Sequence, residues 1–209
     1  MRTYIFLSLL CVSLVACGTK TPAVNPDMNH THADFAVWID GKMLDFSGPE
    51  FMSEELTPAE EEELKHQTGK VVKTDVASLQ KYLHLHDGNG HVIHRHKPGL
   101  TLKDFFTTIK VDIQGNCYTS FEPMADGQQC YDHPFRMFVN GIEKTPFDLA
   151  YAFMDTDHIL ITNASDTAEV SLELSKMTDD ACMYSKTCPE RGEPPTENCI
   201  ADASVPCTQ

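Results

Sequence analysis

The stretch HADFAVWIDGKMLDFS, residues 32–47, alternates apolar and polar side chains on both sides of Asp40-Gly41. Asp-Gly is a favoured pair for a two-residue hairpin turn, so this stretch predicts a β-hairpin. The register opposes Val37 to Leu44 and gathers the apolar side chains on one face. The other face then carries His30, His32, Asp34, Trp38, Met43 and Asp45.

Three further patterns extend the fold from this hairpin. RMFVNGIEK, residues 136–144, predicts a second hairpin with an Asn-Gly turn. GLTLKDFFTTIKV, residues 99–111, has apolar residues at helical spacing, with Thr101 as its cap. A strand is expected over residues 158–162. This order predicts an α+β domain over residues 30–165, in which a mainly antiparallel or mixed sheet packs against one principal helix, an arrangement compatible with a β-grasp.

The stretch YLHLHDGNGHVIHRH, residues 82–96, predicts a third hairpin, and its loop length decides which side chains share a face. A two-residue turn would place the two His-x-His pairs on opposite faces. A three-residue loop over residues 88–90, with Gly90 in the left-handed conformation, sets His84 opposite His94. Only the second register separates the histidines from the apolar residues, so we expect the three-residue loop.

This register brings several imidazoles to one surface and predicts a metal site. Residues i and i+2 of a strand point to the same face, and opposed residues are closer still. Imidazole is a ligand for zinc, copper and nickel, and we expect one or two ions of zinc or copper. The expected ligands are His84, His86, His94 and His96, joined by His30, His32 and Asp34 if the strand over residues 30–39 is a neighbour in the sheet. Asp34 is either a ligand or an acceptor that orients an imidazole.

Two interpretations without a metal compete with this one. Histidines can occupy an exposed strand face as ordinary polar residues. They can also form a pH sensor, because neighbouring imidazoles repel one another once they are protonated. Three His-x-His pairs in one chain favour the metal, since clustered imidazoles have no evident structural use on a strand face.

The N-terminal residues have the pattern of an export signal. Arg2 precedes an apolar run that is too short to span a membrane, and Leu-Val-Ala-Cys ending at Cys17 resembles a bacterial lipobox. We therefore expect residues 1–16 to be a lipoprotein signal peptide and residues 17–29 a lipidated cysteine and tether. The chain would then be anchored to a membrane by lipid and face the periplasm or the cell surface. A plain signal peptide or an uncleaved anchor is the alternative.

The cysteines agree with an oxidising compartment, where thiols form disulfides. Cys117 and Cys130 flank a short loop and are expected to pair with each other. The segment over residues 166–209 is rich in cysteine and proline and poor in aliphatic residues, so we expect a disulfide-stapled tail. It contains Cys182, Cys188, Cys199 and Cys207, for which three pairings are open. A four-thiolate zinc knuckle is the competing interpretation, but the spacing lacks paired C-x2-C motifs.

The net charge of −15 argues against one class of partner. Nucleic-acid binding requires lysine and arginine to neutralise phosphates, so we expect no nucleic-acid partner. Residues 50–67 hold a block of glutamates in which Thr57 and Pro58 are typical of a helix start, and this block predicts a short solvated helix.

The motifs H-x-H-x-D-F at residues 30–35 and H-x-H-D-x-x-G-x-V-I-H-x-H at residues 84–96 resemble those of a family of small exported prokaryotic proteins without assigned biochemistry. The similarity covers roughly residues 30–163, and the acidic block is a departure from it. Some members are labelled disulfide isomerases or thioredoxin-like. This chain lacks the Cys-x-x-Cys that a thioredoxin-type site requires, so the resemblance implies a domain and no mechanism.

Three functional hypotheses follow from these patterns. The first is an envelope lipoprotein that binds zinc or copper through its clustered histidines, with the acidic residues raising the local concentration of cations. The second is a zinc-dependent hydrolase or hydratase with chemistry like that of carbonic anhydrase, which also requires a general base and a substrate pocket. The third is an adhesion or assembly module with a structural metal. More ligands than one catalytic ion uses favour binding over catalysis, and the sequence indicates no protein partner.

Overall fold

A computed structural model describes residues 23–26, 30–52, 79–121, 127–193 and 195 of the chain. Its main element is a seven-stranded mixed sheet in the order β3-β4-β1-β10-β8-β9, with β2 paired to β1. The strands of this sheet are β1 (Thr31–Ile39), β2 (Lys42–Met43), β3 (Leu83–His84), β4 (Val92–Arg95), β8 (Arg136–Val139), β9 (Ile142–Lys144) and β10 (Asp157–Thr162). The helices are α3 (Leu102–Thr108), α4 (Thr167–Leu174) and α5 (Ala181–Tyr184), with short 3-10 turns η1 (Pro49–Phe51) and η2 (Pro189–Arg191).

The two hairpins with Xaa-Gly turns have the predicted register. Leu44 N donates to Val37 O over 2.9 Å, and Asp40 and Gly41 both have positive φ, as a type I′ turn requires. The hairpin of β8 and β9 turns in the same way at residues 140–141, and Val139 pairs with Ile142. Since β1 and β10 run parallel at the centre of the sheet and the other pairs are antiparallel, the mixed α+β class is confirmed.

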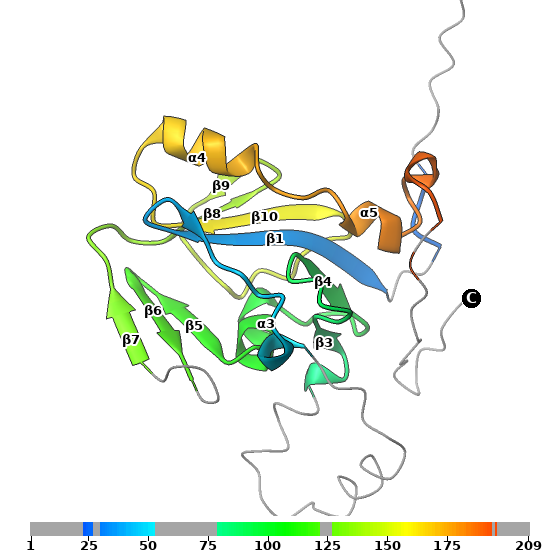
Figure 1. Cartoon of the computed structure of the whole chain (residues 1–209), viewed down its shortest axis with the longest axis horizontal. Helices are drawn as coiled ribbons and strands as arrows, with labels where there is room; N and C mark the ends of the chain where they lie inside the picture. The colour runs from blue at the N-terminus through cyan, green and yellow to red at the C-terminus, as the bar shows by residue number, and fades with distance from the viewer. Residues whose placement is uncertain (1–22, 27–29, 53–78, 122–126, 194, 196–209) are drawn as a thin grey trace, which may run out of the picture.

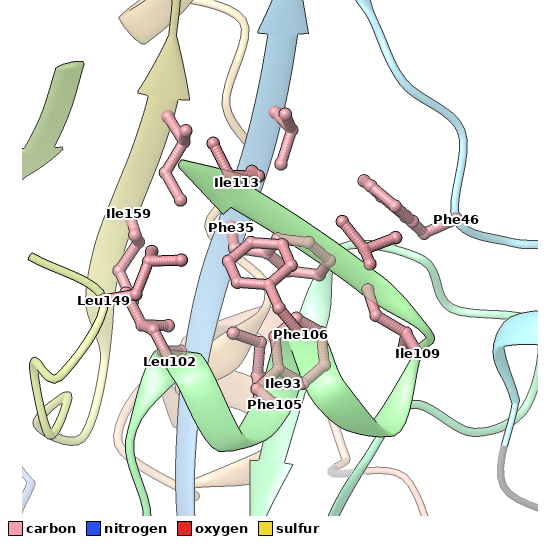
Figure 2. Packing of buried hydrophobic residues seen from close by; sticks show 14 of the residues in the cluster. Phe35, Phe46, Ile93, Leu102, Phe105, Phe106, Ile109, Ile113, Leu149 and Ile159 are labelled. Atoms are coloured by element: carbon pink, nitrogen blue, oxygen red, sulfur yellow. The ribbon is translucent and has the colours of Figure 1, made fainter. Parts of the chain in front are cut away.

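The alternation along β1 divides the molecule into two apolar layers. Phe35 and Val37 point into the larger core, where Figure 2 shows Phe35 beside Phe105 and Phe106 of α3. Trp38 points to the other face and packs with Val170 of α4. Figure 1 shows α4 along one side of the sheet and α3 on the other. The polar side chains of β1 therefore lie on the face that α4 and α5 cover.

The principal helix, α3, begins where the sequence predicts. Thr101 Oγ1 accepts a hydrogen bond from Asp104 N, and the Asp104 carboxylate accepts one from Thr101 N, which completes a capping box. Phe105 and Phe106 on the next turn are buried against the sheet. The cap and the apolar face together fix the helix across the larger core.

A second sheet of three strands follows α3. It consists of β5 (Val111–Gln114), β6 (Cys117–Ser120) and β7 (Gly127–Cys130), paired in that order. Cys117 lies opposite Cys130 in the ladder, and the two form the predicted disulfide. The sequence predicts only a loop between Cys117 and Cys130, so these three strands were not predicted.

The histidine hairpin has the predicted pairing but a different loop. Leu83 pairs with Arg95 and His84 with His94, as the odd-length loop requires. The prediction that Gly90 adopts the left-handed conformation is wrong, because Asp87 and Gly88 have positive φ instead. Gly90 is needed for another reason: a Cβ atom there would lie 2.5 Å from the backbone of Phe46 and Ser47.

The segment after residue 165 packs on the sheet along the part that the structure describes. Helix α4 contributes Val170 to the smaller apolar layer, and α5 lies at the end of β1 (Figure 1). Cys182 and Cys188 form a disulfide that closes the loop after α5. The predicted tail thus starts with two helices that belong to the folded domain, and its remaining cysteines, Cys199 and Cys207, lie outside the described residues.

Candidate metal centre

Three adjacent strands bring the histidines together. Strand β4 lies between β1 and β3, and in the two ladders His94 is opposite both His32 and His84. Side chains at alternate positions share a face, so His96, directly after β4, and His30, directly before β1, follow on the same side. The condition that the first strand is a neighbour of the histidine hairpin is met.

The six predicted imidazoles form one continuous group of rings, which we call the histidine cluster. Its members are His30, His32, His84, His86, His94 and His96. Neighbouring ring centroids are 3.9 Å apart for His30 and His96, 4.8 Å for His96 and His84, 5.6 Å for His84 and His86, 3.9 Å for His86 and His94, 4.9 Å for His94 and His32, and 5.4 Å for His32 and His30. Each ring therefore lies next to two others, and the six contacts form a closed loop.

The nitrogen atoms of two pairs approach one another closely. His30 Nε2 and His96 Nε2 are 3.3 Å apart, and His86 Nε2 and His94 Nδ1 are 3.1 Å apart. Two nitrogens bound to one tetrahedral zinc ion at its usual bond length are about 3.3 Å apart. The spacing within each pair is thus close to that of two ligands on a common ion.

Most of the cluster is withdrawn from water. His32, His84, His94 and His96 are between 0 and 6% exposed. Burying several protonated imidazoles side by side would be costly, because like charges repel strongly away from water. Neutral imidazole is the form that binds metal ions.

Two rings of the hairpin have Nδ1 held by groups that can only accept hydrogen bonds. His84 Nδ1 is 2.7 Å from Gln80 O, a backbone carbonyl. His86 Nδ1 is 2.7 Å from the Asp87 carboxylate. In each neutral ring the hydrogen must lie on Nδ1, so Nε2 carries the lone pair. Outer partners of this kind commonly orient the histidine ligands of metals and strengthen them as donors.

A third ring, His32, is oriented through a chain of two hydrogen bonds. Ser185 Oγ donates to the Asp155 carboxylate over 2.6 Å, and His32 Nδ1 lies 2.8 Å from the same Oγ. Since the hydroxyl hydrogen is used on Asp155, the hydroxyl oxygen accepts from His32 Nδ1–H. His32 thus also presents the lone pair on Nε2, a buried atom.

Helix α5 covers the cluster. The Tyr184 ring meets His94 edge-on at 4.7 Å between centroids and lies 5.6 Å from His32. Its hydroxyl accepts a hydrogen bond from Asn89 Nδ2 over 3.1 Å, which ties the helix to the loop of the histidine hairpin. The C-terminal segment therefore completes the site with a ring and with the hydroxyl of Ser185.

Asp34 lies on the same face of β1 and has partners at the first residue of α5 and in the turn before it. Its carboxylate accepts hydrogen bonds from Thr178 Oγ1, Asp180 N and Ala181 N over 2.6 to 2.9 Å. These bonds hold the start of α5 against the sheet. Since the segment that carries Ser185 follows, Asp34 supports the cluster through the helix.

Asp34 also belongs to a second group of potential ligands. Asp34, His158 and Asp179 place one ligand atom each within 4.8 Å of one another, so this group could hold a metal ion. His158 Nε2 is 3.3 Å from Asp179 and 4.0 Å from Asp34. The carboxylate oxygens of Asp34 already serve α5, which favours a structural role for this group.

The outer partners of the cluster were not predicted from the sequence. Gln80, Asp155, Tyr184 and Ser185 have no motif that marks them, and His158 belongs to no His-x-His pair. Ser185 is 153 positions from His32. Of these partners, only Gln80 and Asp87 lie close in sequence to the rings that they contact, so only they could have been predicted from the sequence.

The expected signal peptide, the lipidation at Cys17 and the acidic helix near residue 57 lie outside the described residues, and of the expected tether only residues 23–26 are described. Among the residues that the structure describes, no helix combines the length and the apolar character needed to cross a membrane. No protein-family model, curated protein or solved structure matches the chain.

Proposed function

We propose that this protein binds a transition-metal ion, zinc or copper, through the histidine cluster and serves as a metal-binding protein of the cell envelope. The observation that carries the proposal is the orientation of three of the rings. His32, His84 and His86 each have Nδ1 next to an acceptor, which places the hydrogen of the neutral ring on Nδ1 and its lone pair on Nε2, the tautomer of many histidine ligands of metals.

The ligand set supports these two metals over others. Calcium and magnesium require oxygen ligands, whereas six imidazoles suit zinc and copper. Thiolates are not available from Cys117, Cys130, Cys182 or Cys188, because all four are in disulfides. A ligand set of imidazole alone is borderline in softness, so it discriminates poorly between zinc and copper(II).

The setting of the protein is the second part of the proposal. The lipobox pattern ending at Cys17 supports an exported lipoprotein whose membrane contact is a lipid anchor. The net charge of −15 would raise the concentration of cations near the protein at low ionic strength. Together these features fit capture or buffering of metal at the periplasmic or outer surface of a membrane.

The test is the metal content of the protein, purified without chelators and measured by elemental mass spectrometry before and after incubation with zinc or copper(II). We expect tightly held metal in the wild type and none in the His84→Ala/His94→Ala variant. His133→Ala is the matched control, since this exposed histidine lies outside the cluster. Absence of metal from the wild type at micromolar zinc and copper would overturn the proposal.

A further inference from the structure

The histidine cluster contains two close nitrogen pairs that do not share a residue. In one pair the Nε2 atoms of His30 and His96 are 3.3 Å apart. In the other pair His86 Nε2 and His94 Nδ1 are 3.1 Å apart. Each pair alone has the spacing expected for two nitrogens on one tetrahedral ion, about 3.3 Å.

Each pair has a third imidazole next to it. His84 lies beside His96, with 4.8 Å between ring centroids, and its Nδ1 is held by Gln80 O. His32 lies beside His94 at 4.9 Å, and its Nδ1 is held by Ser185. In both cases the third ring lies next to the pair and, when neutral, has its lone pair on Nε2.

The number of donors also exceeds what one ion uses. Zinc in proteins binds four ligands, commonly with water among them when three are histidines. Six imidazoles that close a circle therefore leave two or three donors unused on a single ion. Two ions with three imidazoles each account for all six.

We propose that the cluster is a two-metal centre, an inference that rests on the proposed function. The first ion is bound by His30, His84 and His96. The second is bound by His32, His86 and His94. Each ion keeps a fourth position for water or another small ligand, and the ions belong to the class of zinc or copper(II).

The two halves can be separated by paired substitutions. The variant His30→Ala/His96→Ala removes two ligands of the first ion and none of the second. The variant His86→Ala/His94→Ala does the reverse. We expect isothermal titration with zinc, checked by elemental mass spectrometry, to give two ions per chain for the wild type and one for each variant. Circular dichroism would establish that each variant is folded.

A measurement on the wild type is independent of the variants. With two equivalents of copper(II), neighbouring ions in one cluster are expected to couple magnetically, which lowers the electron paramagnetic resonance signal per copper and adds a half-field transition. Two bound ions with uncoupled spectra would overturn the proposal, as would one ion per chain that both variants lose. The second of these results leaves the proposed function intact, whereas no bound metal removes both.

Discussion

The hydroxyl of Ser185 is a sensitive place to test whether the outer partners of the cluster matter. It accepts from His32 Nδ1 over 2.8 Å and donates to the Asp155 carboxylate over 2.6 Å, and the residue is 1% exposed. Ser185→Ala removes the link between ring and carboxylate while it leaves every imidazole in place. The His32 ring then loses the partner that fixes its hydrogen on Nδ1.

The size of the effect follows from the bonds that are lost. A hydrogen bond to a charged group contributes about 1.5–3 kcal/mol, and a factor of ten in affinity corresponds to about 1.4 kcal/mol. Loss of the link should therefore weaken metal binding by about 10- to 100-fold, the range typical for outer partners of histidine ligands.

The assay is a competition titration of zinc against a chromophoric chelator. Ser171→Ala is the matched control, because its hydroxyl bonds only to Thr167 O on the exposed side of α4. Thermal unfolding of the metal-free variants separates a loss of affinity from a loss of fold. Equal zinc affinity in the wild type and in folded Ser185→Ala would refute the role of the outer partners.

Two further predictions concern the elements around the site. The disulfide between Cys182 and Cys188 closes the loop that carries Ser185. Replacing both cysteines by serine should therefore lower the unfolding free energy by about 2 kcal/mol and weaken zinc binding. The same change at Cys117 and Cys130, in the other sheet, should leave zinc affinity unchanged; equal losses in both variants would contradict a local role. Burial raises the pKa of Glu173 above its ordinary value of 4.5, so the folded protein holds that proton more tightly than the unfolded chain. The stability that this provides is complete in acid and is lost as the pH rises through the raised pKa. In the wild type this loss of unfolding free energy amounts to about 1.4 kcal/mol for each unit by which the pKa is raised. Glu173→Gln should remove it, which urea unfolding from pH 4 to pH 8 would measure. Identical pH dependence in variant and wild type would contradict it.

The parts of the fold that the sequence predicts are those with a local cause. The turns at Asp40-Gly41 and Asn140-Gly141 need positive φ, which these residues tolerate, so the turns fix the hairpin registers. The pairing of His84 with His94 follows because only that register separates apolar from polar side chains. The helix start at Thr101 follows from a cap that is four residues long.

The parts that it does not predict depend on distant segments. A glycine is required at position 90 because the backbone of Phe46 passes close to it. The sequence instead predicted a left-handed backbone conformation at this position. The hydrogen bonds that link Asp155 and Ser185 to His32 depend on the packing of the α5 segment against the sheet. A strand pattern shows which residues share a face, but it carries no information on what later covers that face.

The histidine cluster depends both on local strand patterns and on distant segments of the chain. Alternation along β1, β3 and β4 selects the residues, and the pairing of the strands sets their spacing. The later segments then add acceptors that fix the tautomers of the rings. Fixed tautomers would bring little advantage to histidines that served only as a polar surface, because a neutral imidazole facing water can carry its hydrogen on either ring nitrogen.

The measurement that tests the central claim most directly is X-ray absorption spectroscopy of the zinc-loaded protein. Binding through the histidine cluster predicts nitrogen scatterers at about 2.0–2.1 Å, with the outer-shell pattern of imidazole, and no sulfur at about 2.3 Å. A first shell of sulfur, or of oxygen without imidazole scattering, would contradict the assignment of the histidines as the metal ligands.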